Sequence, residues 1–217
     1  MRSITSFTCL TLLLATSGAA AAQNRSPVET MIGFELITVG IETAAADSAG
    51  VGSRAWGIQM PASVTAFRVL TLNADGGLLF LSDEQAFTQE TNVGERTSGV
   101  SAGTLALSAG LRTPVLSLGG EQPLLVSAGV NAGRNFVNVE RSIAQCVDCH
   151  SEDVRVRAGN FWEGVLHVVP GSGTISARYR KYSGDSNFRD ALMIGYSTPL
   201  RRPGPRTSET PPPEPSP

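Results

Sequence analysis

The sequence predicts an all-β protein, an antiparallel up-and-down β-barrel of about eight strands. Segments of more than ten residues alternate between apolar and polar positions, few segments show helical periodicity, and turn-like connections alternate with longer polar ones. Strands in globular proteins average about five or six residues, whereas strands of about ten residues are typical of barrels that cross an outer membrane. The length of the segments therefore favours a membrane barrel over a soluble sandwich.

The chain divides into four parts by composition. Residues 1–22 combine Arg2, the apolar run "FTCLTLLLAT" and the small-residue segment "SGAAAAQ", which is the pattern of a secretory signal peptide. Residues 23–30 form an N-terminal extension, and residues 31–198 form the barrel. Residues 199–217, "PLRRPGPRTSETPPPEPSP", are so rich in proline and charge that we expect a disordered tail. The net charge of −2 gives no indication of nucleic-acid binding.

Eight segments are predicted as strands, near residues 32–42, 50–60, 64–81, 96–112, 122–139, 154–169, 174–183 and 188–197. The fifth shows the alternation over about a dozen residues: even positions carry Leu124, Val130 and Phe136, while odd positions carry Asn131 and Asn135. One face of such a strand is apolar, and the other is small or polar.

The connections also alternate in length. "MPAS", "TPVLSLGGEQ" and "PGSG" are turn-like, whereas "TAAADSAG", "SDEQAFTQETNVGE" and "RSIAQCVDCHSED" are longer polar loops. Outer-membrane barrels have short periplasmic turns and longer outward loops. The longer set is therefore expected outside, and the Pro-rich tail on the periplasmic side.

With these strands and connections, the chain resembles the small outer-membrane β-barrel domain proteins, the eight-stranded group that includes the OmpA transmembrane domain and the OmpX and OmpW proteins. The resemblance covers roughly residues 31–197 and carries no catalytic motif. It implies an outer-membrane location, contact with outer-membrane lipid and the barrel-assembly machinery, and a structural or interaction role. Such barrels commonly finish at a C-terminal aromatic residue, whereas here Tyr196 in "ALMIGYSTPL" is followed by about twenty further residues.

The alternation places charged residues in the predicted lumen. An eight-stranded lumen is only wide enough for side chains, and isolated buried charge is costly, so these charges are expected to pair and to plug the barrel. The expected lumen residues are Arg155, Arg157, Glu163 and His167 on the sixth strand, Arg178 and Arg180 on the seventh, and Asn73 and Asp75 elsewhere. Four aromatic residues are expected on the outward face: Trp56, Phe136, Trp162 and Tyr196.

The segment "QCVDCHSED" has the spacing C-x-x-C-H, at which haem can be attached covalently to an exported chain. The polar flanks lack the apolar pocket that haem needs, so the favoured prediction is a Cys146–Cys149 disulfide in an oxidising compartment. A haem c held by Cys146, Cys149 and His150 is the alternative. A metal site on these residues, with Asp148, Glu152 or Asp153 as a fourth ligand, is weaker. The prediction is therefore no cofactor and no metal.

Three functional classes follow. The first is a non-enzymatic outer-membrane barrel with a structural or interaction role, and the second is a mono-haem electron-transfer protein. The third is a soluble periplasmic β-barrel that binds a small apolar ligand, which requires an apolar interior. The sequence contains no G-x-S-x-G elbow, P-loop or H-E-x-x-H motif, so no catalytic residue is assigned.

Overall fold

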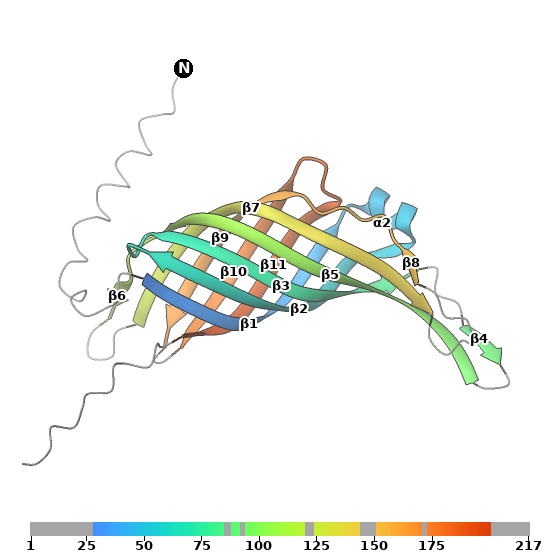
Figure 1. Cartoon of the computed structure of the whole chain (residues 1–217), viewed down its shortest axis with the longest axis horizontal. Helices are drawn as coiled ribbons and strands as arrows, with labels where there is room; N and C mark the ends of the chain where they lie inside the picture. The colour runs from blue at the N-terminus through green and yellow to red at the C-terminus, as the bar shows by residue number, and fades with distance from the viewer. Residues whose placement is uncertain are drawn as a thin grey trace, which may run out of the picture.

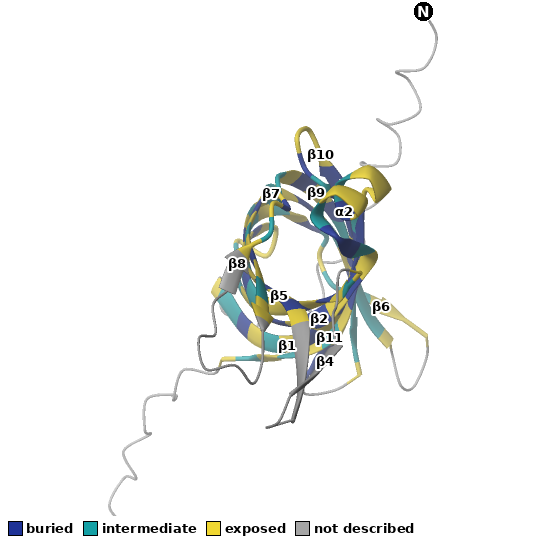
Figure 2. Ribbon diagram, turned by 90° about the vertical axis from the view of Figure 1, so that its right-hand side faces the viewer, coloured by how far each residue is buried: buried dark blue, intermediate teal, exposed yellow. Residues whose placement is uncertain are grey.

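The computed structural model describes residues 28–84, 88–91, 94–119, 124–143, 151–170 and 173–200. Eight long antiparallel strands close into one barrel, which confirms the predicted fold class (Figures 1 and 2). The long strands are β1 (Val28–Ile41), β2 (Val51–Ala66), β3 (Leu70–Asp83), β5 (Gly94–Arg112), β7 (Leu124–Ile143), β9 (Asn160–Val169), β10 (Thr174–Ser183) and β11 (Phe188–Pro199). Three short strands accompany them: β4 (Thr88–Thr91), β6 (Leu116–Leu118) and β8 (Ser151–Asp153).

Pairing between the first and last strands closes the ring. β1 pairs with β11 from Met31↔Pro199 to Ile41↔Phe188, and β5 pairs with β7 across the other side. The end of the barrel where β1 begins and β11 ends is called the turn end below, and the end where β1 finishes at Ile41 is called the loop end. Because every long strand has a partner on both sides, the barrel wall has no open edge.

The turn between β2 and β3 lies further along the chain than predicted. "MPAS" continues β2, and the chain reverses at Phe67 and Arg68, whose φ angles are 52° and 63°. Val69 donates its backbone N–H to the carbonyl of Ala66 to close this turn. Positive φ at both central residues is the geometry that suits a two-residue hairpin, but glycine or asparagine usually supplies it. The sequence carried no such signal here, so the predicted turn at residues 60–63 was wrong.

The predicted loop "TAAADSAG" contains a helix, α2 (Thr43–Ala49), which the sequence analysis missed. Its alanines favour a helix, and Gly50 ends it in the left-handed conformation with φ of 64°. Arg141 donates to the carbonyls of Ala49 and Gly50 and lies 3.2 Å from Asp83, which ties the helix end to β7 and β3. No helix among the described residues is long and apolar enough to cross a bilayer.

The sixth predicted strand begins later than expected, at Asn160 rather than at residue 154. Residues 154–159 lie across the loop end and form no strand ladder. Individual hydrogen bonds join them to neighbouring segments, such as Val154 N–H to Val139 O and Asn187 N–H to Arg157 O. Strand β10 has the predicted bounds, and β11 runs to Pro199. β1 begins at Val28, three residues before the predicted start of the barrel domain.

Candidate functional site: the barrel interior and its outer face

A layer of charged side chains fills the middle of the barrel interior. It contains three carboxylates and two guanidinium groups, each at most 5% exposed: Glu35, Asp75, Glu163, Arg178 and Arg180. They come from β1, β3, β9 and β10, so this layer connects strands on several sides of the wall. The name charged layer refers to these five residues.

Asp75 bridges the two arginines of the charged layer. Arg178 donates to its two carboxylate oxygens at 3.2 and 2.8 Å, and Arg180 donates to Oδ2 at 2.7 Å. Glu163 accepts from Nε and Nη2 of Arg180 at 3.0 and 2.8 Å, and Glu35 lies 3.0 Å from Arg178. Every charge therefore has a partner of opposite sign, as a buried charge requires.

Neutral groups satisfy the remaining acceptors of the charged layer. Gln59 donates to Glu35 at 2.7 Å, Ser176 donates to the other oxygen of Glu35 at 2.9 Å, and Asn131 donates to Glu163 at 3.1 Å. The Arg180 guanidinium also stacks over the Phe161 ring, 3.9 Å from its centroid. These contacts fix the guanidinium planes across the middle of the barrel interior.

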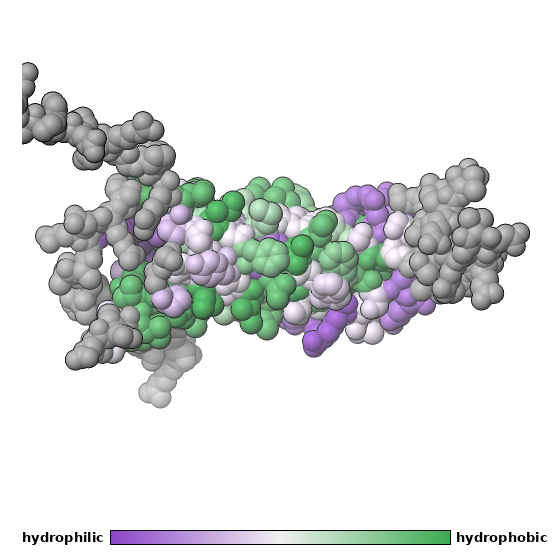
Figure 3. Space-filling view, turned by 90° about the horizontal axis from the view of Figure 1, so that it is seen from below, coloured by the Kyte–Doolittle hydropathy of each residue, from purple (hydrophilic) through white to green (hydrophobic). Residues whose placement is uncertain are grey.

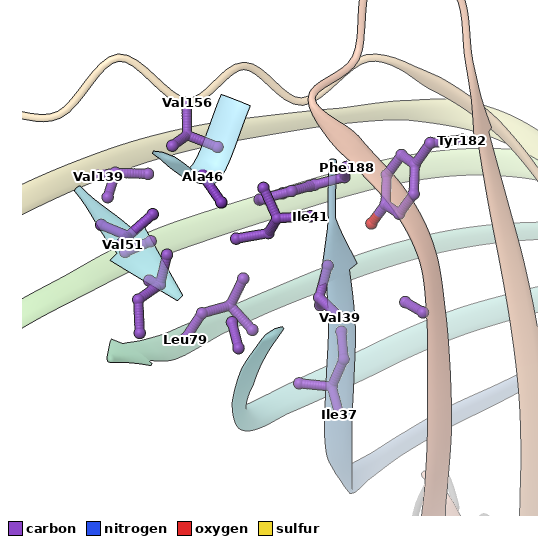
Figure 4. Close-up of a cluster of buried hydrophobic side chains, with 14 of the residues drawn as sticks. Ile37, Val39, Ile41, Ala46, Val51, Leu79, Val139, Val156, Tyr182 and Phe188 are labelled. Carbon is purple, nitrogen blue, oxygen red and sulfur yellow. The ribbon is translucent and has the colours of Figure 1, made fainter. Parts of the chain in front are cut away.

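Apolar side chains fill the interior between the charged layer and the loop end (Figure 4). This apolar plug draws residues from all eight long strands, from α2 and from residues 154–159. Its members include Ile37, Val39, Ile41, Ala46, Val51, Ala55, Leu79, Leu81, Val100, Val139, Val156, Phe161, Tyr182, Phe188 and Met193. Ala46 of α2 and Val156 pack onto its outer end and are 1% and 5% exposed. The plug therefore closes the lumen on the loop side.

A small polar cavity of about 40 Å³ lies on the turn side of the charged layer. Arg112, Thr71 and His167 line it, and Nδ1 of His167 and Oγ1 of Thr71 have no hydrogen-bond partner among the described residues. A cavity of this size with such groups accommodates a few water molecules. It does not provide room for an organic ligand.

The structure brings together some of the residues that sequence analysis placed in the lumen. Glu163, Arg178 and Arg180 meet in the charged layer with Asp75, and His167 lines the polar cavity. Glu35, the third carboxylate, was missed because its neighbours in "IGFELITV" are apolar on both sides. The alternation along this segment could have identified Glu35, because it has the same parity as the inward-facing Met31 and Ile37 of β1.

Arg155 and Arg157 do not lie in the lumen, which corrects that prediction. Both are exposed on residues 154–159, while Val156 between them enters the apolar plug. The physical reason is that the interior changes polarity along the barrel axis. Next to the apolar plug, the apolar side of an alternating segment turns inward, as in a soluble core.

The outer face shows the opposite polarity to the charged layer. Large apolar side chains stand on the outward positions of all eight long strands, and Figure 3 shows them over the middle of one face. Examples are Phe34, Leu36, Ile58, Leu72, Leu78, Leu105, Leu107, Val130, Leu166, Ile175, Leu192 and Ile194. Between the turn end and the level of Arg54 on β2 and Lys181 on β10, the charged side chain at a described outward position is Arg134 on β7, the Cα partner of Leu107, and the remaining described outward positions there carry no Asp, Glu, Lys or Arg. This surface is called the apolar band below.

Aromatic side chains mark the loop-side boundary of the apolar band. Trp56 packs against Phe80 with ring centroids 4.9 Å apart, and Trp162 meets the edge of Tyr179 at 6.2 Å. The two tryptophans and Phe136 are about half exposed or more on the outward face, and Tyr196, 48% exposed on the same face, lies near the turn end, three residues before the end of β11. Aromatic rings at the edges of an apolar band are typical of membrane–water interfaces.

The C-x-x-C-H segment lies outside the described residues, which resume at Ser151. Cys146, Cys149 and His150 belong to the seven residues that connect β7 to β8, where Ser142 faces Ser151. The predicted disulfide, the haem alternative, the signal peptide and the tail from residue 201 are therefore still predictions. Among the described residues, no group of histidine, cysteine, aspartate and glutamate has the arrangement of a metal site.

Comparisons with known proteins found resemblance in structure only. No family model and no curated protein matches the sequence. Ail of Yersinia pestis, the attachment invasion locus protein, gives a TM-score of 0.45 at 11% identity in complex with the heparin analogue sucrose octasulfate, covering 80% of this chain and 97% of Ail. A second Ail structure gives 0.44 at 14% identity over the same shares, and Neisserial surface protein A gives 0.44 at 9% over 83% and 100%.

Proposed function

We propose that this chain is a non-enzymatic, non-conducting barrel of the bacterial outer membrane with a structural or interaction role. The polarity of the wall carries the proposal: charge is buried inside, and the exterior over the depth of the apolar band is apolar, with Arg134 as its one charged side chain among the described residues. In water such a surface would expose many large hydrophobic side chains at once, which monomeric soluble proteins avoid. In a bilayer, the same surface meets hydrocarbon and the closed ladder satisfies the backbone.

The interior argues against a pore and against the soluble alternative. The apolar plug and the charged layer fill successive levels of the lumen, and the polar cavity is too small for a solute. A soluble ligand-binding barrel would need an open apolar cavity inside and a polar exterior, and this barrel has the reverse arrangement around its charged layer. We expect no unitary conductance in a planar bilayer.

The loop end supplies the surface for interaction. β5 and β7 have 19 and 20 residues, whereas β9 and β10 have 10 each, so one side of the wall extends beyond the other. β4 and β8 pair with these extensions, which project at the loop end in Figure 1. The proposed partner contacts and the proposed Cys146–Cys149 disulfide both belong to this outward side, with the barrel-assembly machinery and lipid as the other partners.

Cell fractionation combined with gel mobility tests the proposal. The mature chain should sediment with outer-membrane markers, and it should migrate faster in SDS before heating than after heating because the closed barrel stays folded. Recovery of the chain in the soluble periplasmic fraction, with the same mobility in both samples, would contradict the proposal. Alkylation with and without reduction, followed by intact-mass measurement, tests the disulfide and would reveal an attached haem.

A further inference from the structure

We propose that a cluster of basic side chains above the apolar band binds the phosphate of a lipid headgroup in the outer leaflet. The cluster consists of Arg54 on β2, Lys181 on β10 and Arg189 on β11, and it is called the basic cluster below. The inference rests on the proposed membrane location and adds a specific lipid site to it. Asp190 is the acidic side chain that lies among these basic residues on the outer wall.

Strand register brings the basic cluster together. Arg54 is the Cα partner of Gly40 on β1, Gly40 is the partner of Asp190, and Asp190 is the partner of Lys181. These four positions form one hydrogen-bonding row across β2, β1, β11 and β10. Cα atoms of adjacent strands lie about 5 Å apart along such a row, so the long basic side chains share a single area of the outer wall.

An irregularity in β11 adds the third basic group. The pairing of β1 with β11 shifts between Gly40 and Ile41, and as a result Arg189 and Asp190 both lie over Gly40. A Cβ atom at Gly40 would come within 2.5 Å of Asp190 Oδ1 and 3.2 Å of Arg189 Nη2. The missing side chain at Gly40 therefore lets both groups lie against the barrel wall, between Arg54 and Lys181.

The charges of the basic cluster are unbalanced. Arg189 pairs with Asp190 at 3.0 Å, with the two side chains 50% and 31% exposed. Neither Arg54 nor Lys181 has an ion-pair partner among the described residues. Two cations thus remain available, a guanidinium that can make two parallel hydrogen bonds and an ammonium that acts as a point charge.

The position of the basic cluster selects a lipid headgroup as the occupant. Trp56 follows Arg54 by two residues on β2, toward the turn end, and Trp162 is the Cα partner of Lys181, so aromatic rings of the apolar band lie below and beside the basic cluster. A phosphate held there would have its acyl chains along the apolar band. A soluble anion could use the cations but not the apolar surface below them.

Native mass spectrometry tests the proposal on the full mature chain folded in a non-ionic detergent. The probes are bisphosphorylated lipid A, its dephosphorylated form and phosphatidylcholine, with inorganic phosphate as a soluble competitor. The test variant is Arg54→Gln with Lys181→Gln, which leaves the Arg189–Asp190 pair intact. The control is Arg155→Gln with Arg157→Gln, which removes the same charge from exposed positions outside the strands.

The wild type should bind bisphosphorylated lipid A more tightly than either other lipid, and millimolar phosphate should not displace it. The test variant should lose roughly 25-fold in affinity, because each basic residue next to an anionic headgroup contributes about fivefold, while the control should match the wild type. Equal affinity for phosphorylated and dephosphorylated lipid, equal losses in both variants, or displacement by phosphate would overturn the site. Failure of the chain to give a heat-sensitive folded band in detergent would instead overturn the membrane location on which the site depends.

Discussion

Replacing Asp75 with asparagine should strongly destabilise the barrel, because this one carboxylate neutralises both arginines of the charged layer. It is 2% exposed and accepts from Arg178 and Arg180 at 2.7 to 3.2 Å. Removing one partner of a buried ion pair costs about 3–5 kcal/mol, because the other charge remains buried without compensation. Glu35 and Glu163 still face the arginines in the variant, so we expect the low end, about 3 kcal/mol.

Asp190→Asn is the matched control for this substitution. It makes the same chemical change to a carboxylate whose ion pair with Arg189 measures 3.0 Å, within the range of the Asp75 contacts, but this carboxylate lies on the outer wall with 31% exposure. Exposed pairs contribute about 0–1 kcal/mol, so the control should unfold close to the wild type. Urea titration of the barrel in phospholipid vesicles, followed by the mobility of the folded band, gives both free energies of unfolding. Equal stability of the two variants would refute the assignment of the charged layer as the interior support.

Three further substitutions test the apolar band, the apolar plug and the packing of the wall in the same assay. Leu107→Arg should destabilise the folded barrel by about 2–4 kcal/mol because Leu107 lies in the apolar band. The control is Ser101→Arg, on the same face nearer the loop end, which should destabilise the barrel by about 0–1 kcal/mol. Met193→Ala should cost about 2–5 kcal/mol, since this fully buried side chain would leave a cavity in the plug, and a neutral result would show that the plug is not packed. Gly57→Ala should cost about 1–3 kcal/mol because its Cβ would lie 2.9 Å from Cα of Leu79 and closer still to the Leu78 carbonyl, whereas Gly76→Ala, with nothing within 4 Å, should not destabilise.

The wall of the barrel was predictable because alternation reports directly which side chains share a face. In β7, Leu124, Val130 and Phe136 are exposed on the outside, and Asn131 and Asn135 are buried inside, as the period of two predicts. The charged layer followed in part from the same parity. Its detailed pairing depends on the register between β3, β9 and β10, which one strand alone does not specify.

The parts that the sequence did not predict depend on the level of each residue along the barrel axis. Alternation assigns a side chain to a face, but it does not say whether that face meets the charged layer or the apolar plug. Arg155 and Arg157 were misplaced for this reason, because Val156 enters the plug and the arginines turn outward. The turn at Phe67 and Arg68 was missed since side chains that rarely adopt positive φ adopt it there.

Tryptophan fluorescence in vesicles tests the inverted polarity of the wall most directly. The chain contains two tryptophans, Trp56 and Trp162, and both lie on the outer face with exposures of 63% and 50%. If this face contacts lipid, brominated acyl chains should strongly quench the emission, shallow bromines more than deep ones, and Trp56→Phe should leave the same behaviour for Trp162. Emission typical of tryptophan in water, with no dependence on brominated lipid, would contradict the account.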